Sequence, residues 1–306
     1  QHTAGSRMTR PGDSRFTVRA QARNGLPTLR VAYFFSGTKR RASIGECLAV
    51  LCRKAGIGLV MHEVDTMVGG KAHNLLDKAA QSDWLSRILD GEFDMCIHSP
   101  PCASWSRAPF SDDKPPQPVR NKAHPWGIPW LLKAEQDKAR DGNEFVHFTI
   151  QARGAAKTAK ARGFRVRSLL EHPEDLGKTH RGTPASIWQL PDIRELARDS
   201  DFITVAGRQC KFGLDAKKPT RLLSDVKGIS EFGMLGWPVF DAAGYYTGPL
   251  PHSCGHTHVT GRGRALERGP RGAERRAEAE REGVVESQRA ELGGKVDEEA
   301  QPAVVR

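Results

Sequence analysis

Short apolar segments typical of buried strands alternate in this chain with segments that have the periodicity of amphipathic helices. The strand-like segments cover residues 30–35, 57–64, 93–98, 164–171, 202–206 and 221–223. The helical patterns cover residues 43–54, 81–89, 144–162 and 184–197. Strands that alternate with helices favour a mostly parallel sheet with helices on both faces. We therefore predict an α/β, Rossmann-like fold, which places ligands at the carboxyl ends of its strands.

Length and composition exclude several classes of protein. The chain has 306 residues, of which 38% are hydrophobic, and its net charge is +11. That length allows one large domain or two modest ones, and the composition is that of a globular protein. No apolar run reaches the roughly 18 residues that span a bilayer, and the first residues lack the apolar segment of a signal peptide. We expect no membrane contact and an intracellular location, nuclear if the source is a eukaryote.

The positive charge is concentrated near the beginning of the chain. The first 30 residues hold six arginines and one aspartate, so we interpret residues 1–28 as a disordered basic arm. Residues 259–306 carry nearly balanced charges, which predicts a tail that is helical near 272–282 and otherwise disordered. The predicted folded domain is 29–258. About half of the net charge remains for that domain, which allows a nucleic-acid partner but does not diagnose one.

A proline-rich turn directly after the third predicted strand is the most specific chemical feature. It reads Ser99-Pro100-Pro101-Cys102, and the two prolines stiffen the turn and fix the direction of the cysteine. A thiol held in this way can act as a nucleophile if a neighbour stabilises its thiolate. The alternative interpretation of Cys102 is a buried structural thiol.

A second polar feature closes the fourth predicted strand. Glu171 lies there, in the segment Leu170-Glu171-His172-Pro173. Because parallel strands end at one edge of a sheet, we expect Glu171 and Cys102 to share that edge. A partly buried carboxyl group has a raised pKa and can donate a proton to a ring nitrogen. The alternative is a helix or turn cap, a role that also suits the nearby acidic residues.

The turn after the first predicted strand favours a cofactor. It contains Phe35, Ser36 and Gly37, and a glycine there allows the backbone to approach a ligand closely. Glu63 and Asp65 follow the next strand, where nucleotide-binding folds place an acid that binds ribose hydroxyls. The two features together predict an adenosine-containing cofactor.

These motifs occur in the order Phe-Ser-Gly, Glu-x-Asp, Pro-Pro-Cys-x-Ser-Trp-Ser and Leu-Glu-x-Pro. Over about residues 29–258 the chain resembles a divergent, stand-alone branch of the cytosine-5 DNA methyltransferases. The resemblance implies a class I, S-adenosylmethionine-dependent fold that methylates C5 of cytosine in DNA. By position, Cys102 would attack C6 of the base and Glu171 would hold or protonate N3. Such chemistry requires a flipped or single-stranded base.

The same resemblance assigns further roles by position. Lys218 and Arg221 would replace the arginines of the family's basic motif near the active site. The cofactor contacts that it implies are Phe35, Ser36, Gly37, Glu63 or Asp65, Asp94 and Pro100.

Several departures from the family pattern favour other functions. The cofactor loop continues as Thr38-Lys39-Arg40-Arg41 without a second close glycine, and His172 stands where the family usually has asparagine. Residues 225–250 are too few for a large target-recognition region, and the charged tail has no match to the final family motif. The alternatives are a catalytically degenerate, mobile-element-derived nucleic-acid-binding protein and an RNA cytosine methyltransferase. We predict no protein partner.

Aromatic and basic residues are interleaved after Cys102 and in a long insertion, residues 111–141, which we interpret as a loop. Such mixtures can stack unpaired bases and hold phosphates. The nucleic-acid contacts that we predict are Ser104, Trp105, Arg107, Arg120, Lys122 and Trp126. The alternative is that these side chains anchor the long loop to the body of the domain.

A cluster of histidine and cysteine near the end of the domain raises the question of a metal. Cys254, His256 and His258 can bind zinc in principle, with Cys210 folded beside them. Their spacing fits no standard zinc finger, so we predict a polar edge segment and no metal.

Overall fold

The computed structural model describes residues 27–39, 43–111, 115–198, 201–214 and 216–255. The predicted basic arm, apart from its last residues, and the charged tail with its predicted helix lie outside the described residues. His256 and His258 lie outside them as well.

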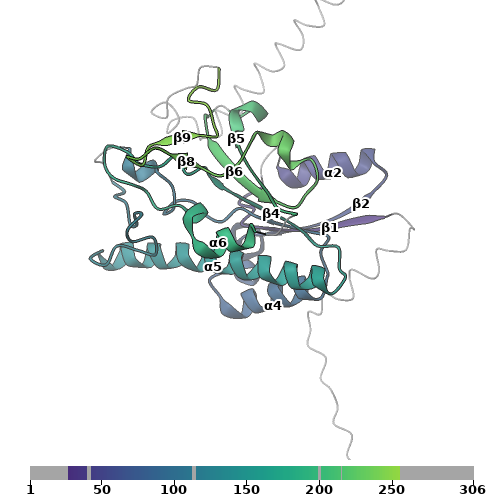
Figure 1. Ribbon diagram of the computed structural model, residues 1–306. Helices are drawn as coiled ribbons and strands as arrows, with labels where there is room; N and C mark the ends of the chain where they lie inside the picture. The colour runs from purple at the N-terminus through teal and green to yellow at the C-terminus, as the bar shows by residue number, and fades with distance from the viewer. Residues whose placement is uncertain (1–26, 40–42, 112–114, 199–200, 215, 256–306) are drawn as a thin grey trace, which may run out of the picture.

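A seven-stranded sheet with the order β2-β1-β3-β4-β6-β5-β7 forms the centre of the domain (Figure 1). Four neighbouring strands are parallel: β2 (Gly58–Val64), β1 (Thr28–Phe34), β3 (Met95–His98) and β4 (Arg167–Pro173). The other three are β6 (Pro219–Ser224), which is antiparallel to both β4 and β5 (Ile203–Arg208), and β7 (Met234–Leu235). The predicted α/β class and mostly parallel sheet are confirmed.

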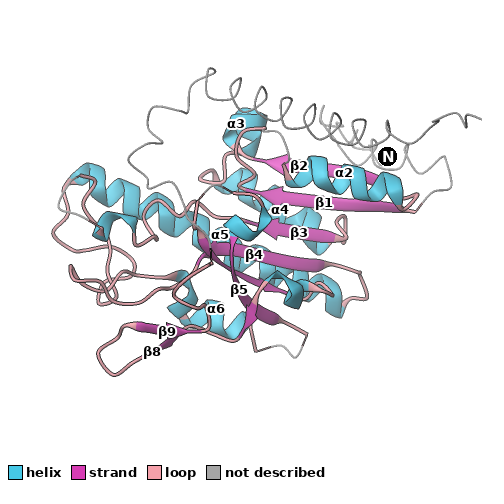
Figure 2. Ribbon diagram, turned by 90° about the horizontal axis from the view of Figure 1, so that it is seen from above, coloured by secondary structure: helices cyan, strands magenta, loops and turns pink. Residues whose placement is uncertain are grey.

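Helices cover both faces of this sheet (Figures 1 and 2). α2 (Ile44–Lys54) lies on one face, and α4 (Lys78–Leu89), α5 (Lys133–Ala161) and α6 (Pro191–Leu196) lie on the other. The short helix α3 (Thr66–Gly69) follows β2. Within the described part of the chain, no helix has both the length and the apolar character that crossing a bilayer requires.

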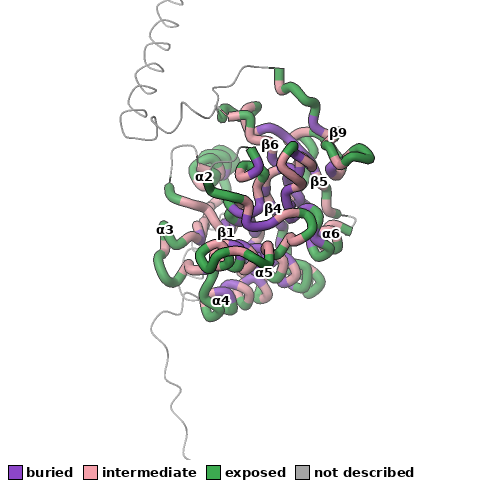
Figure 3. Tube along the Cα trace, turned by 90° about the vertical axis from the view of Figure 1, so that its left-hand side faces the viewer, coloured by how far each residue is buried: buried purple, intermediate pink, exposed green. Residues whose placement is uncertain are grey.

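The central strands are apolar on both faces because both faces are covered. On the side of α4 and α5, Phe34 packs against Trp84 and Phe148, with ring centroids 5.6 and 5.2 Å away. On the side of α2, Val31 and Tyr33 form a smaller cluster. Figure 3 shows the resulting buried centre beneath exposed helix surfaces.

Helix α5 corrects one predicted boundary. Its 29 residues begin at Lys133, inside the segment 111–141 that we interpret as a loop, and not near residue 144. The first turns are rich in charge and hold few large apolar residues, so their periodicity is weak. They are helical because Ala139 and Gly142, which are small and buried, let the preceding loop pack closely against the helix.

A two-stranded hairpin of β8 (Val239–Phe240) and β9 (Tyr246–Gly248) stands apart from the main sheet (Figure 2). It lies within residues 225–250, the interval that is too short for a large target-recognition region. The hairpin is attached to the domain through Tyr246, whose hydroxyl donates a hydrogen bond of 3.0 Å to Glu174 Oε1.

Candidate active site

Strands β1 to β4 end side by side at what we call the carboxyl edge of the sheet. Phe34 at the end of β1 is paired with both Val64 and His98, the last residues of β2 and β3. The turn that holds Cys102 follows β3 directly, and Glu171 lies close to the end of β4. The two residues therefore share this edge, as predicted from the order of the motifs.

Three of the predicted catalytic residues meet at the carboxyl edge. Lys218 Nζ lies 3.3 Å from Glu171 Oε1 in an ion pair whose two side chains are 40% and 20% exposed. Both groups interact electrostatically with the Cys102 thiol. Gln209, which the sequence did not single out, donates hydrogen bonds to Glu171 Oε1 at 3.3 Å and to Thr220 Oγ1 at 3.0 Å. Gln209 thus orients the carboxylate from the end of β5.

The charge state of Cys102 depends on these neighbours. Burial raises the pKa of its thiol, the Lys218 ammonium lowers that pKa, and the Glu171 carboxylate raises it. The desolvation effect is the largest, so the unliganded protein holds a neutral thiol at neutral pH. Lys218 is the cation that stabilises the thiolate once the proton leaves.

The turn after Cys102 is held against α5 by a buried cluster of side chains. Trp105 Nε1 donates to the Gly142 carbonyl of α5 at 3.2 Å. The Arg120 guanidinium lies over the Trp105 ring at 3.8 Å and donates to Ser104 Oγ at 3.1 Å. Ser104, Trp105 and Arg120 are all buried. The structure therefore gives these three predicted nucleic-acid contacts an anchoring role, the alternative left open by the sequence.

The remaining predicted nucleic-acid contacts lie on the surface. Arg107 and Lys122 are exposed, and Trp126 is 38% exposed. The Trp126 ring packs on His147 with its centroid 4.8 Å away, so one face of the indole is covered.

Arg221 does not lie with Cys102, Glu171 and Lys218. It is fully buried and forms a two-point ion pair with Glu174, at 2.7 Å from Nε and 2.8 Å from Nη2. Its Nη1 donates to Thr204 Oγ1 at 2.7 Å and to the Gly236 carbonyl at 2.6 Å. Successive residues of a strand point to opposite faces, and Arg221 faces away from Glu171. Its predicted catalytic role is corrected to a structural one.

The predicted cofactor turn lies at the ends of β1 and β2. Phe35 has a φ of 62°, rare for a residue other than glycine, and Gly37 has a φ of 71°. The Gly37 amide donates to Asp65 Oδ2 at 3.0 Å. Ser36 is half-buried beside them and donates to the Gly37 carbonyl at 3.4 Å. The structure therefore brings the two predicted cofactor motifs into direct contact.

A cavity of about 190 Å³ opens beside this turn. Phe35 and Asp65 line it together with Phe145 and with His73, which the sequence did not single out. Pro101, the residue before Cys102, also lines it. Pro100, a predicted cofactor contact, is buried and does not line it. A ligand in the cavity would therefore contact the turn that carries Cys102.

Two predicted cofactor residues lie elsewhere. Glu63 points toward the start of α2, where a Cβ on Gly45 would lie 3.0 Å from its Oε1. Asp94 precedes β3 and so lies at the opposite, amino edge of the sheet. There it accepts a hydrogen bond of 2.8 Å from the Arg30 amide and pairs with the Arg30 guanidinium. The predicted adenine contact of Asp94 is therefore corrected.

A basic cleft of about 280 Å³ opens where β5 ends at Arg208 and β6 begins at Pro219. Cys102, Glu171 and Lys218 are not among its lining residues. Among the described residues no acidic side chain lines it, whereas its basic and aromatic side chains are Arg107, Lys178, Arg208, Lys217, His252, Tyr245 and Tyr246. Of these only Arg107 was predicted as a contact, because the others come from segments that folding brings together.

The described residues hold no group of three His, Cys, Asp or Glu side chains suited to a metal ion. Cys254, from the predicted polar edge segment, and Cys210 are both half-buried. Comparisons with known proteins add no family: no protein-family model matches the chain, and no significant match was found among curated proteins or solved structures.

Proposed function

We propose that this protein transfers a methyl group from S-adenosylmethionine to C5 of a cytosine in DNA, with Cys102 as the nucleophile. One observation carries the proposal. The turn of Cys102 contributes Pro101 to the cavity beside Phe35 and Asp65, and its thiol interacts electrostatically with the ion pair of Glu171 and Lys218. A candidate nucleophile, a carboxyl group and a cavity lined by the predicted cofactor motifs thus meet at the edge where α/β folds bind ligands.

The chain's own residues form the bond to the base and move the proton to N3. The Cys102 thiol proton passes to the Glu171 carboxylate, which transfers it to N3 as Sγ forms a bond to C6, so the charge that develops in the ring is neutralised. Lys218 stabilises the thiolate before attack. S-adenosylmethionine supplies an electrophilic methyl group, which C5 accepts. Solvent then takes the C5 proton, the bond from C6 to Sγ breaks with Cys102 leaving as the thiolate, and N3 returns its proton to Glu171, which frees the methylated base.

We assign cofactor binding to the turn at residues 35–37 and to Asp65. Asp65 already accepts from the Gly37 amide through Oδ2 and from the Met67 amide through Oδ1, at 3.0 and 2.9 Å. A carboxylate fixed in this way at the edge of the cavity suits a ribose hydroxyl. The strained Phe35 backbone, whose conformation costs about 1–3 kcal/mol, is typical of a ligand-contacting turn.

The basic cleft supports a nucleic-acid substrate. Cationic side chains attract the phosphate backbone, and exposed aromatic rings stack unpaired bases. In the cleft, Lys178 Nζ lies 5.5 Å from the centre of the Tyr245 ring. The target base must leave its stack to reach Cys102. RNA cytosine is the variant substrate that the same cleft would accept.

One observation favours a second candidate function, a nucleic-acid-binding protein that has kept the fold and lost catalysis. The cavity of about 190 Å³ is smaller than the roughly 300–1,000 Å³ of most small-molecule sites. Calorimetric titration with S-adenosylmethionine and with its demethylated product separates the two functions. Saturable heat supports the methyltransferase, and no heat with either compound supports the binding protein.

Covalent trapping tests the chemistry directly. DNA with 5-fluorocytosine has no C5 proton to lose, so the methylated base should stay bonded to Cys102 in the presence of cofactor. We expect Cys102→Ser to give no adduct and Cys210→Ser, another half-buried cysteine, to give the normal yield. Glu171→Gln should lose the adduct and still bind cofactor. An equal adduct in the Cys102→Ser variant would refute the assignment of the nucleophile.

A further inference from the structure

Helix α5 carries a buried arginine whose hydrogen-bonding capacity is largely unused. Arg153 is 3% exposed. Its Nη1 makes two long hydrogen bonds, to Ser168 Oγ at 3.3 Å and to the Leu223 carbonyl at 3.4 Å. Its Nε and Nη2 find no partner among the described residues. Native proteins rarely leave buried N–H groups of a charged side chain unpaired, so these two donors point to an absent ligand.

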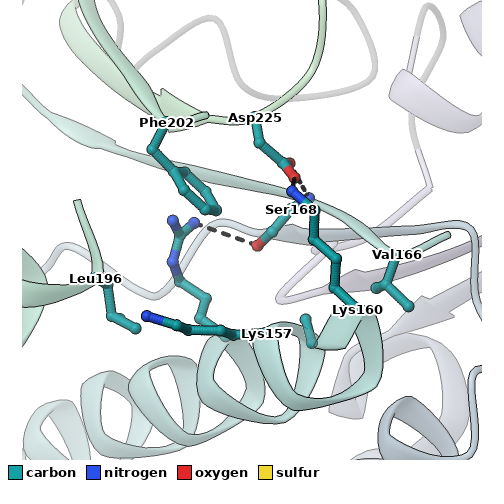
Figure 4. Close-up of a pocket in the computed structure, with 9 residues that line it drawn as sticks. Lys157, Lys160, Val166, Ser168, Leu196, Phe202 and Asp225 are labelled. Atoms are coloured by element: carbon teal, nitrogen blue, oxygen red, sulfur yellow. Dashed lines mark hydrogen bonds and ion pairs between the residues drawn. The ribbon is translucent and has the colours of Figure 1, made fainter. Parts of the chain in front are cut away.

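A cavity adjoins this guanidinium. Its volume is about 30 Å³, whereas one water needs only about 10–15 Å³. Figure 4 shows Lys157 and Lys160 of α5 on one side of it and Ser168 and Phe202 on the other. Val166 and Phe202 precede β4 and β5, so the cavity lies toward the amino edge of the sheet, away from Cys102.

The charges around the cavity are mostly positive. Asp225 is the one carboxylate among the described residues that line it. That carboxylate is already engaged by the Ser168 amide at 2.7 Å and by Lys160 Nζ at 3.4 Å. Arg153 forms no ion pair with a described residue, and burial lowers the pKa of its guanidinium to about 10. A buried cation in this state is best compensated by an anion.

We propose that this cavity binds a small oxyanion, of the phosphate or carboxylate type. The Nε and Nη2 atoms lie on the same edge of the Arg153 guanidinium. Their two parallel N–H groups match two oxygens of one oxyanion. The site is separate from the carboxyl edge, so it is independent of methyl transfer.

Thermal denaturation in inorganic phosphate tests this site, because a ligand that binds only the folded state raises the melting temperature. At constant ionic strength, adjusted with sodium chloride, we expect a saturable rise for the full chain. Arg153→Met should abolish the rise. Arg53→Met removes an exposed charge at the end of α2 and should leave the rise unchanged. Acetate tests the carboxylate class, and a larger response to adenosine monophosphate would assign the phosphate group to a larger ligand.

A second variant keeps the test decisive if Arg153→Met does not fold. Lys157 is exposed, so Lys157→Glu should fold, and its carboxylate should weaken phosphate at least tenfold. The proposal is overturned if the parent protein shows no saturable rise. It is also overturned if phosphate stabilises the Lys157→Glu variant as strongly as the parent protein.

Discussion

Two glycines of helix α5 should respond in opposite directions to the same substitution. Gly142 lies under the turn that carries Cys102, and an added Cβ would stand 2.4 Å from Ser104 Oγ and 3.0 Å from Arg120 Nη2. Gly154 lies three turns further on, and an added Cβ there meets nothing within 4 Å. We expect Gly142→Ala to destabilise the protein and Gly154→Ala to stabilise it.

The magnitudes follow from helix propensity and packing. Replacing glycine by alanine inside a helix stabilises it by about 0.5–1 kcal/mol, and this is the whole effect at Gly154. At Gly142 the new methyl group must displace Ser104, and overpacking of a filled interior costs about 1–3 kcal/mol. The displaced hydroxyl also loses the hydrogen bond from Arg120, which adds about 1–3 kcal/mol for the donor left buried. The net cost at Gly142 is about 1–5 kcal/mol, after the gain in propensity is subtracted.

Urea unfolding followed by far-ultraviolet circular dichroism measures both free energies of unfolding. The difference between the two variants should be about 2–6 kcal/mol, because the gain in propensity is common to both, and this is outside the error of the extrapolation. The rate of 5-fluorocytosine trapping should fall in Gly142→Ala alone, since Cys102 precedes the displaced residues. Equal stabilisation by the two substitutions would refute the close packing of the Cys102 turn on α5.

Three further predictions concern charged and titratable groups. Arg221→Met should lower the free energy of unfolding, measured in urea, by about 3–5 kcal/mol, because it leaves Glu174 buried without its partner. The double variant with Glu174→Met should recover most of that loss, and a loss below 1 kcal/mol in the single variant contradicts the structural role of Arg221. His98 is fully buried with a pKa lowered to about 3, so between pH 6.5 and 3 the unfolded chain binds a proton that the folded protein does not, and stability falls as the pH falls. Between pH 7 and 4.5 the free energy of unfolding of His98→Phe should therefore fall by about 2–3 kcal/mol less than that of the parent protein. An unchanged pH dependence argues against a buried, neutral His98. Lys218→Met should shift the pH profile of trapping to higher pH, because Lys218 lowers the pKa of the Cys102 thiol, and an unshifted profile removes Lys218 from thiolate stabilisation.

The fold was largely predictable because its signals are local. Each buried strand is an apolar run, and helices α2 and α4 have clear periodicity with polar caps at Ser43 and Asp77. The first turns of α5 were missed because their helical state depends on a loop that packs on Gly142, and no local pattern reports such a contact. The meeting of Cys102 with Glu171 was predictable too, since both follow or close parallel strands.

The roles of individual polar residues were less predictable. Asp94 precedes its strand, and the parallel direction of β3 alone places it at the amino edge. Arg221 and Lys218 are three residues apart, yet one lies inside β6 and the other before it. Their separation into a buried ion pair and a partly exposed neighbour of Glu171 depends on Glu174, which lies 47 positions away from Arg221 in the chain.

The order of apolar runs and motifs was enough to specify the α/β class, the parallel core and the edge at which Cys102 and Glu171 meet, because strand direction and chain order constrain which loops can meet. Burial was decided only by tertiary packing. Trp105 and Arg120 look like a nucleic-acid contact in the sequence, and they became an anchor because α5 covers them. Arg153 looks like an ordinary helix surface residue, and it became a buried cation with unpaired donors because the sheet lies on top of it. A side chain's exposure is a property of its distant neighbours, and therefore of the folded structure.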